Sequence, residues 1–396
     1  EIGVRLVGSE MCIRDSSKTV IGVDFGTQSA RAVLVNAENG EIIYSCRKEY
    51  PYNSTPVPAI DCAENLPCAT DYEMTLYELL RNVIPEEYRK TVAGICVDAT
   101  SLTMVLLAED GRALSELDGW SEAAHARVKL WKYHRAQEKA DEALNLARNL
   151  QEPFLGRTGG SISCEWMLPK LLEVRDEAPE IYSKIDLAMD LCEFLTFRLT
   201  GQLVRSIGSL SYKCLWAEDL SFPERTFLNG LRAGFYEEYC HFLRGDVRKP
   251  GECAGMLRSE LTKRWGLPEQ IPVATGMLDG HTSLATMGAF EPGDAALIVG
   301  TSNVCTVQDR KLQELKDVCG VAQDGMVTGS CGIDTGQSST GNMLGWFVEH
   351  MAGWQIHREA EERKISPHQV LAERIQKPWE NKVCLLYTSD AADDLT

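Results

Sequence analysis

The sequence predicts an α/β protein built from two successive units, each of which combines β-strands with crossing helices. Three observations support this prediction. The chain has 396 residues, and a single hydrophobic core stops growing below that size, so at least two domains are expected. A strand-rich start gives way to a long helix-rich stretch, and a second strand-rich stretch begins near Asp294. Hydrophobic residues at 44% and charged residues at 25% are typical of a globular chain.

Three antiparallel strands are expected at the start of the first unit. The run 19–23 is short, apolar and β-rich, and 32–35 is a second such run. The dipeptide Asn39-Gly40 then predicts a hairpin turn before a third strand at 41–46, because Asn and Gly tolerate the positive φ angles of a tight turn. A tight glycine-containing loop joins the first two strands.

The remainder of the chain is expected to alternate helices with strands. Apolar runs bounded by polar residues predict buried strands at 92–100 and 271–275, and a hairpin is expected at 104–111. In the second unit, strands are expected within 295–307 and 326–336. Helices are expected in six segments: 71–90, 122–149, 164–182, 187–199, 252–267 and 338–353.

Composition excludes several classes of function. The formal net charge of −18 repels phosphate backbones and anionic lipids, so no nucleic-acid or membrane partner is expected. The 14 cysteines are scattered and form no CxxC pair, which indicates a reduced, cytoplasmic protein without a thiolate metal site. No apolar run is long enough to span a membrane. A homo-oligomer is left open.

Both ends of the chain differ from the rest. Residues 1–16 have neither helical nor strand periodicity, and the tail 384–396 follows a helical stretch without a domain-ending pattern. Both strings resemble translated adaptor sequence, and a disordered native terminus is the alternative. We therefore expect a non-native leader, a native chain from about 17 to 383 that is interrupted, and a non-native tail.

The first motif that carries chemistry is the loop after the first strand. Asp24 ends the strand, and Gly26 and Thr27 follow in a turn. The carboxylate can hold Mg²⁺ through water, while the glycine lets backbone N–H groups approach phosphate oxygens. Arg31, four residues past Thr27, could reach a γ-phosphate. The alternative is an ordinary hairpin turn.

Two further loops follow predicted strands. Asp279 lies between glycines after a buried strand, where a carboxylate can accept a proton from a substrate hydroxyl. A simple turn residue is the alternative, and His281 is interpreted as a structural hydrogen-bonding histidine instead of a metal ligand. Gly300 and Thr301 form a second candidate phosphate loop, weak when taken alone. The three loops in this order are more specific than any one of them.

These motifs make the sequence resemble the FGGY family of carbohydrate kinases over residues 18–383, and within that family the ribulokinase group. The likeness implies two actin-like (ribonuclease-H-like) domains with an interdomain cleft: an N-terminal domain at 17–290 and an incomplete C-terminal domain at 291–383. The similarity is densest in six segments: 24–35, 128–134, 159–170, 211–216, 299–304 and 319–342.

The resemblance implies a role for each matching position. Asp279 matches the general base, and Asp24 matches the aspartate that organises Mg²⁺. The positions expected to contact the phosphates of ATP are Gly26, Thr27, Gln28, Arg31, Gly300 and Thr301. The positions expected to contact or shape the sugar pocket, besides the base, are Asp98, Ser101, Lys213 and Asp334.

The function that the resemblance implies is transfer of a phosphoryl group from ATP to the terminal hydroxyl of a ketopentose, with ribulose as the expected substrate in arabinose-type catabolism. Three departures affect the sugar. Asp334 stands where ribulokinases usually carry Glu, the pocket loop lacks the usual Phe and Cys near Ala99 and Leu102, and Gly280 replaces Ala.

Three alternatives stay open. The first is another FGGY kinase acting on xylulose or a pentitol. The second is an actin- or Hsp70-like nucleotide switch, and the third is an inactive fragment, because the family's adenine-binding segment is expected beyond residue 383. Lys129 and Trp131 are expected in the core, with a role in the sugar pocket as the alternative.

Overall fold

The computed structural model of the protein describes residues 18–50, 66–299, 303–337 and 340–380. The described residues fall into two compact units, one within Glu1–Ile298 and Cys305–Thr335, the other within Val299–Val304 and Gly336–Thr396. The expected leader and tail lie outside the described residues, as do Gly300 and Thr301. The predicted family boundary between residues 290 and 291 stays a prediction.

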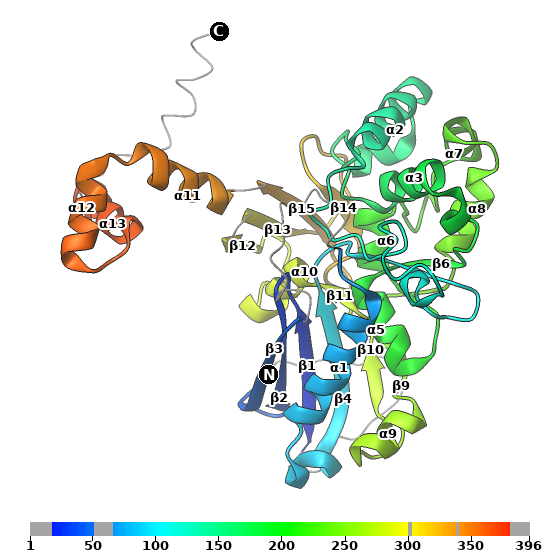
Figure 1. Cartoon of the computed structure of the whole chain (residues 1–396), viewed down its shortest axis with the longest axis horizontal. Coiled ribbons are helices and arrows are strands. Elements are labelled where there is room, and N and C mark those ends of the chain that lie inside the picture. The colour runs from blue at the N-terminus through cyan, green and yellow to red at the C-terminus, as the bar shows by residue number, and fades with distance from the viewer. Residues whose placement is uncertain (1–17, 51–65, 300–302, 338–339, 381–396) are drawn as a thin grey trace. The chain divides into compact units, whose positions relative to one another are not determined.

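A seven-stranded sheet organises the first unit (Figure 1). Its strand order is β3-β2-β1-β4-β10-β9, and β11 also pairs with β4. The three predicted N-terminal strands are confirmed as an antiparallel meander, and β1 then pairs in parallel with β4. The strands are β1 (Thr19–Phe25), β2 (Ser29–Asn36), β3 (Ile42–Glu49), β4 (Val92–Ala99), β9 (Cys253–Met256), β10 (Pro272–Ala274) and β11 (Met277–Leu278).

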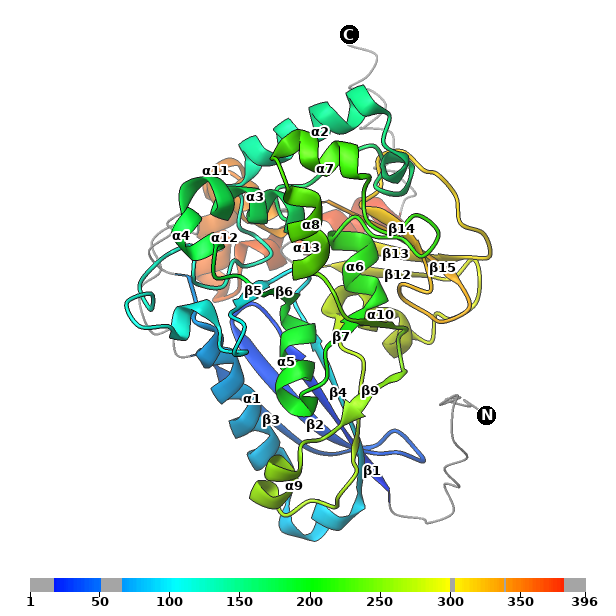
Figure 2. The same ribbon diagram turned by 90° about the vertical axis from the view of Figure 1, so that its right-hand side faces the viewer.

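Two helices cover one face of this sheet. Helix α1 (Ala69–Val83) contacts β2 and β3, α5 (Leu191–Thr200) contacts β4 and β10, and the two helices touch each other (Figure 2). Alternate residues of β1, Ile21, Val23 and Phe25, are buried beneath them. Helix α1 ends before Pro85, whose ring removes a backbone donor, so the predicted helix 71–90 is shorter than expected.

A second core lies among the helices of the middle of the chain. Their buried faces carry aromatic and aliphatic side chains, including Phe227 and Tyr239. The helices are α2 (Gln137–Leu150), α3 (Met167–Glu177), α4 (Pro179–Tyr182), α6 (Ile207–Lys213), α7 (Arg225–Leu231) and α8 (Phe235–Phe242).

Parts of three predicted helices are wrong, and the cause is the same in each. Residues 122–136 form turns, with Lys129 bridged to Met104; Leu187–Asp190 is a strand, β6; and Cys253–Met256 is β9. Each segment lies against the edge of another strand, and short apolar runs take the structure that their tertiary neighbour offers. The predicted hairpin at 104–111 is likewise mainly a long-range pair, because β5 (Met104–Leu107) binds β6.

A four-stranded sheet follows, in the order β12-β13-β15-β14. Its β14–β15 hairpin packs on Tyr212 of α6 through glycines, since a Cβ at Gly320 or Gly332 would lie 2.5 Å from that side chain. This contact sets the adjacent Lys213 beside β15. The strands are β12 (Ala295–Val299), β13 (Asn303–Asp309), β14 (Gly320–Gln323) and β15 (Cys331–Gln337), while α9 (Ser259–Trp265), α10 (Asp279–Met287), β7 (Val204–Ser206) and β8 (Asp246–Arg248) complete the first unit.

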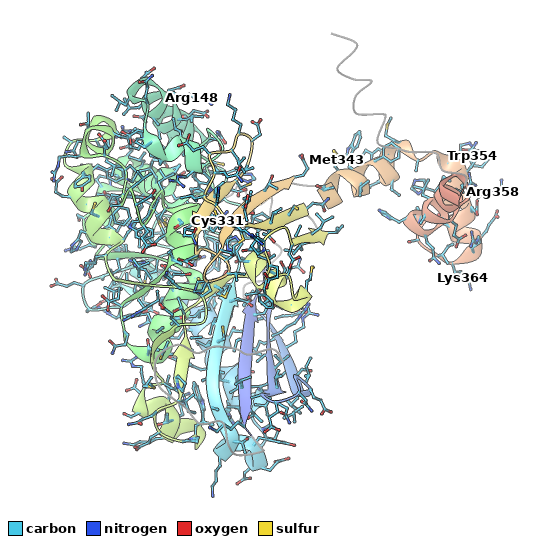
Figure 3. All side chains as sticks on the ribbon, turned by 180° about the vertical axis from the view of Figure 1, so that it is seen from behind. Arg148, Cys331, Met343, Trp354, Arg358 and Lys364 are labelled. Atoms are coloured by element: carbon cyan, nitrogen blue, oxygen red, sulfur yellow. The ribbon has the colours of Figure 1, made fainter. Side chains whose placement is uncertain are left out.

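The described part of the second unit contains three helices, α11 (Thr340–Met351), α12 (Trp354–Arg363) and α13 (Pro367–Glu380). Ile356, Ala360 and Val370 form a small core between α12 and α13. On the outside of α12, the guanidinium of Arg358 lies 5.7 Å from the ring centre of the exposed Trp354 (Figure 3). Within the described parts of both units, no helix combines the length and the apolar character needed to cross a membrane.

Candidate active site

Three carboxylates follow neighbouring parallel strands of the main sheet. Asp24 of β1 lies directly opposite Asp98 of β4, and Met277 of β11 lies opposite Asp98 on the other side. Asp279 comes two residues later, as the first residue of α10. Because the carboxyl ends of parallel strands meet at one edge of a sheet, the three predicted acidic residues gather there.

The three aspartates influence one another strongly. Burial, followed by the charge and hydrogen bond of Asp24 and the charge of Asp279, raises the pKa of Asp98 to about 8. The hydroxyl of Thr282, which donates to the Asp279 backbone carbonyl at 2.7 Å, opposes this shift. A group with this pKa holds a proton at neutral pH unless a cation offsets the negative charge.

The carboxylates suit a hydrated Mg²⁺ ion. Oxygen donors are the ligands that Mg²⁺ prefers, and the Oδ1 atom of Asp98 is buried without a hydrogen-bond partner among the described residues. The described residues contain no cage of three or more His, Cys, Asp or Glu side chains arranged around a single metal position. Mg²⁺ is commonly held by one or two carboxylates together with water and substrate phosphates, which agrees with this sparse donor set.

The predicted first phosphate loop is the turn between β1 and β2. The Tyr50 hydroxyl donates to the Gly26 carbonyl at 2.9 Å, and the Trp131 indole N–H donates to the Thr27 hydroxyl at 3.1 Å. Gln28 lies in the same turn, and its carbonyl accepts from the backbone N–H of Tyr50 at 3.4 Å. The turn is therefore fixed from two sides before any ligand binds.

Arg31 extends the same arrangement onto β2. It is the cross-strand neighbour of Asp24, and its side chain is exposed. Directly opposed residues on adjacent strands share a face of the sheet, so the guanidinium and the carboxylate lie on the same side. A cation beside the carboxylate edge is suited to contact an anionic ligand there.

Asp279 has the environment of a general base. Its Oδ1 atom accepts from the Gly280 N–H at 2.7 Å, and the Ser101 N–H also donates to the carboxylate. Burial raises the pKa of Asp279 to about 6, although these two donors and the charge of Lys213 oppose the shift. The side chain is ionised at neutral pH and more basic than an exposed aspartate.

The tight approach of β11 to α5 fixes the strand that carries this base. A Cβ at Gly276 would lie 2.6 Å from the Cys192 carbonyl oxygen, so a larger residue would displace the start of β11. Ser101, one of the residues predicted to shape the sugar pocket, has a buried hydroxyl that lacks a hydrogen-bond partner among the described residues.

Lys213 and Asp334, both predicted to contact the sugar, are brought together with His281. Lys213 Nζ lies 3.5 Å from Asp334 Oδ2, and His281 Nε2 lies 3.6 Å from the same oxygen. Burial alone would raise the pKa of Asp334, but Lys213 and His281 outweigh it and lower the pKa to about 2. Asp334 is therefore a fixed anion, and His281 is placed as the predicted structural hydrogen-bonding residue.

The sequence interpretation missed Thr282, and it expected Trp131 in the core or in the sugar pocket instead of at the phosphate loop. Thr282, one turn into α10, contacts Asp98, and Trp131 contacts the phosphate loop. The core placement of Lys129 is confirmed, since its side chain is fully buried beside Glu173. The hydroxyl pattern after Asp279 could have indicated Thr282, whereas the contact of Trp131 joins residues 104 positions apart.

Comparison with known proteins gives a consistent set of relatives. Residues 19–287 match the FGGY family of carbohydrate kinases, N-terminal domain. A ribulokinase of Mycolicibacterium smegmatis is 35% identical over 370 residues, which cover 90% of this chain and 65% of that protein. A ribulokinase of Halalkalibacterium halodurans is 32% identical over 367 residues, which cover 91% of this chain and 65% of that protein. The chain thus spans about two thirds of the length of these relatives.

Solved structures share the fold at lower sequence identity. A ligand-bound xylulose kinase from Lactobacillus acidophilus superposes with a TM-score of 0.67 at 18% identity, covering 91% of this chain and 66% of that one. A Plasmodium falciparum glycerol kinase with ADP gives a TM-score of 0.67 at 14% identity, covering 85% and 64%. The predicted α/β architecture is confirmed by these likenesses.

Proposed function

The chain belongs to the FGGY family of carbohydrate kinases, and from this premise we propose that the protein transfers the γ-phosphoryl group of ATP to the terminal hydroxyl of a ketopentose. Ribulose is the proposed acceptor and ribulose 5-phosphate the product. The observation that carries the proposal is the gathering of Asp24, Asp98 and Asp279 at one edge of the sheet. The two ribulokinase relatives support the choice of sugar.

In the proposed mechanism, Asp279 accepts the proton of the attacking hydroxyl. Arg31, the cross-strand neighbour of Asp24, and the turn at Gly26, Thr27 and Gln28 would bind phosphate oxygens, because a guanidinium and backbone N–H groups are suitable donors. Mg²⁺, when bound by Asp24 with Asp98, would neutralise negative charge on the phosphates. Positioning and charge neutralisation supply most of the catalysis in phosphoryl transfer, and these residues would provide both.

Lys213 and Asp334 are proposed to bind sugar hydroxyls, since one supplies N–H donors and the other is a fixed acceptor. Gly300 and Thr301 are proposed as the second phosphate loop from the sequence alone, because they lie outside the described residues.

A second candidate is phosphorylation of xylulose or a pentitol. It is favoured by one observation, that Asp334 is a methylene shorter than the glutamate expected in ribulokinases. A shorter carboxylate side chain changes the distance to a sugar hydroxyl and so the preferred stereoisomer.

The test is release of ADP by the purified chain with ribulose, xylulose and ribitol, together with calorimetric binding of each sugar. Ribulose should give the highest kcat/KM and the tightest binding. A stronger preference for xylulose or ribitol would select the second candidate. ATP hydrolysis that needs no sugar and survives Asp279→Ala would indicate a nucleotide switch.

A further inference from the structure

Lys170, on α3, is a buried lysine whose amino group donates hydrogen bonds to backbone carbonyls. Its side chain is fully buried, and Nζ donates to the carbonyl oxygens of Leu102 and Leu130, both at 2.9 Å. A longer contact of 3.5 Å reaches the Lys129 carbonyl. Burial of this ammonium is unfavourable enough to lower the pKa of Lys170 to about 7.

Asp190, which precedes α5, approaches the same short segment from the other side. It is fully buried, and its Oδ2 atom accepts from the Leu102 N–H at 3.1 Å and from the Ser209 hydroxyl at 2.8 Å. Its Oδ1 atom accepts from the Leu191 N–H at 2.8 Å, which caps the helix. The backbone donor and the backbone acceptor of Leu102 are thus bound by the buried carboxyl group of Asp190 and the buried amino group of Lys170; we call this arrangement the Leu102 clamp.

Leu102 needs such support because its backbone is in an unfavourable conformation. Its φ angle is 48°, in the left-handed region, and its side chain is 1% exposed. A residue with a branched side chain pays about 1 kcal/mol or more in this region, so the conformation persists only where surrounding contacts hold it.

The residues just before Leu102 contact both Asp279 and the end of the strand that carries Asp24. The N–H of Ser101, the preceding residue, donates to the Asp279 carboxylate. The N–H of Thr100 donates to the Phe25 carbonyl at 3.0 Å, at the end of the strand that carries Asp24. A shift of the Leu102 backbone would therefore move a hydrogen-bond donor of the candidate base.

We propose that Lys170 and Asp190 are positioning residues, which hold Leu102 in its left-handed conformation and thereby keep the Ser101 N–H against Asp279. Two buried ionisable side chains add little stability to a core that well-packed apolar side chains could stabilise at least as well. Their placement on the two backbone groups of one residue is explained by the need for a fixed geometry. The link to catalysis rests on the proposed function, but the clamp itself does not.

The direct test is hydrogen exchange at segment 100–103 of the full chain, followed by mass spectrometry. Lys170→Met should accelerate exchange there by about tenfold or more, because a hydrogen bond to a charged group is lost. The matched control is Lys129→Met, which removes another fully buried lysine whose ammonium instead faces Glu173 and Tyr133. Equal exchange in the two variants at matched loss of Tm would overturn the clamp.

A second variant covers the case in which Lys170→Met fails to fold. The double change Lys170→Met with Asp190→Asn removes both charges, so no buried charge is left uncompensated. It should fold and still show the faster exchange at 100–103. Exchange as slow as in the unmodified chain would contradict the proposal.

The catalytic consequence is tested by the pH profile of sugar-dependent ATP turnover. Loss of the Ser101 donor disfavours the ionised carboxylate, so the acid limb should move to higher pH in Lys170→Met and stay in place in Lys129→Met. An unmoved limb together with faster exchange would refute the positioning role. No sugar-dependent turnover in the unmodified chain would refute the proposed function alone, because the exchange experiment still decides on the clamp.

Discussion

Lys213 Nζ lies 3.5 Å from Asp334 Oδ2, and this one contact joins the end of α6 to the middle of β15, 121 residues further along the chain. Both side chains are largely shielded from water, where an unpaired charge is strongly unfavourable. A change to either residue of this pair should therefore affect both the stability of the first unit and the proposed sugar pocket.

Removing one partner of this pair should destabilise the protein. Among the described residues, Lys213→Met leaves the Asp334 carboxylate with His281 as its one nearby cationic partner, and the expected loss in the free energy of unfolding is about 3 kcal/mol. Chemical denaturation measures it. The control is Lys139→Met, because its partner Asp176 keeps Arg232 and the loss should stay below about 1 kcal/mol. Similar losses in both variants would contradict a special role for the Lys213–Asp334 pair.

Lengthening the anion of the same pair should change the choice of sugar. Asp334→Glu moves the carboxylate by about one bond length, so the ratio of kcat/KM for ribulose to that for xylulose should change by about tenfold. A uniform fall for all sugars would indicate a packing defect. An unchanged ratio would remove Asp334 from the specificity-determining residues.

Catalysis should depend on the ionisation of Asp279. A base must be unprotonated to accept a proton, and the pKa of Asp279 is raised to about 6, mainly by burial. Turnover should therefore fall as the pH drops through about 6, and the profile of kcat/KM against pH shows it. Asp279→Asn should lower kcat by about 10²- to 10⁴-fold with little change in sugar affinity. Near-normal turnover of this variant would exclude Asp279 as the base.

The phosphate loop gives a prediction that the sequence did not. Trp131→Phe keeps an aromatic ring but removes the donor to Thr27, so ATP should bind about five- to tenfold more weakly through a less ordered turn. The KM for ATP measures this. Unchanged KM values for both substrates would show that the contact is dispensable.

The sequence predicts those parts of the site that depend on neighbouring residues along the chain, and it does not predict contacts between residues far apart in the sequence. Asp24 and Asp279 each lie at the carboxyl end of a strand with a glycine within the next two residues, and this local pattern is visible in the sequence. The neighbours that tune them are not local: Trp131 reaches the loop from the turns after β5, and Lys170 reaches Leu102 across 68 residues. Single positions carry no mark of such partners, because tertiary packing alone brings them together.

The same limit explains the errors in the fold. The N-terminal meander was predictable because alternating runs and an Asn-Gly turn fix it locally. The strand Leu187–Asp190 is predicted as the start of a helix, because three apolar residues and an aspartate before a helical stretch fit either structure. Only its pairing with Met104–Leu107 decides the outcome, together with the capping box of Asp190 and Glu193 that starts α5 after it.

Asp98 should make the stability of the protein depend on pH. Its pKa is raised from 3.8 to about 8 by burial and by the charge of Asp24, so the folded state holds a proton that the unfolded state releases. The resulting contribution to stability is full below about pH 4 and is lost as the pH rises through about 8. We therefore compare the effect of Asp98→Asn on the free energy of unfolding at pH 8 and at pH 4, in the presence of a chelator. The effect should be more stabilising at pH 8 than at pH 4, by about 2 kcal/mol. Urea denaturation at the two pH values measures this difference.

Adding Mg²⁺ at pH 8 should stabilise the unmodified chain more than the variant, because the cation offsets the charge that Asp98 carries. An equal effect of Asp98→Asn at both pH values would show that the pKa of Asp98 is not raised in the folded protein. Equal stabilisation of the unmodified chain and the variant by Mg²⁺ would separate Asp98 from the proposed Mg²⁺ site.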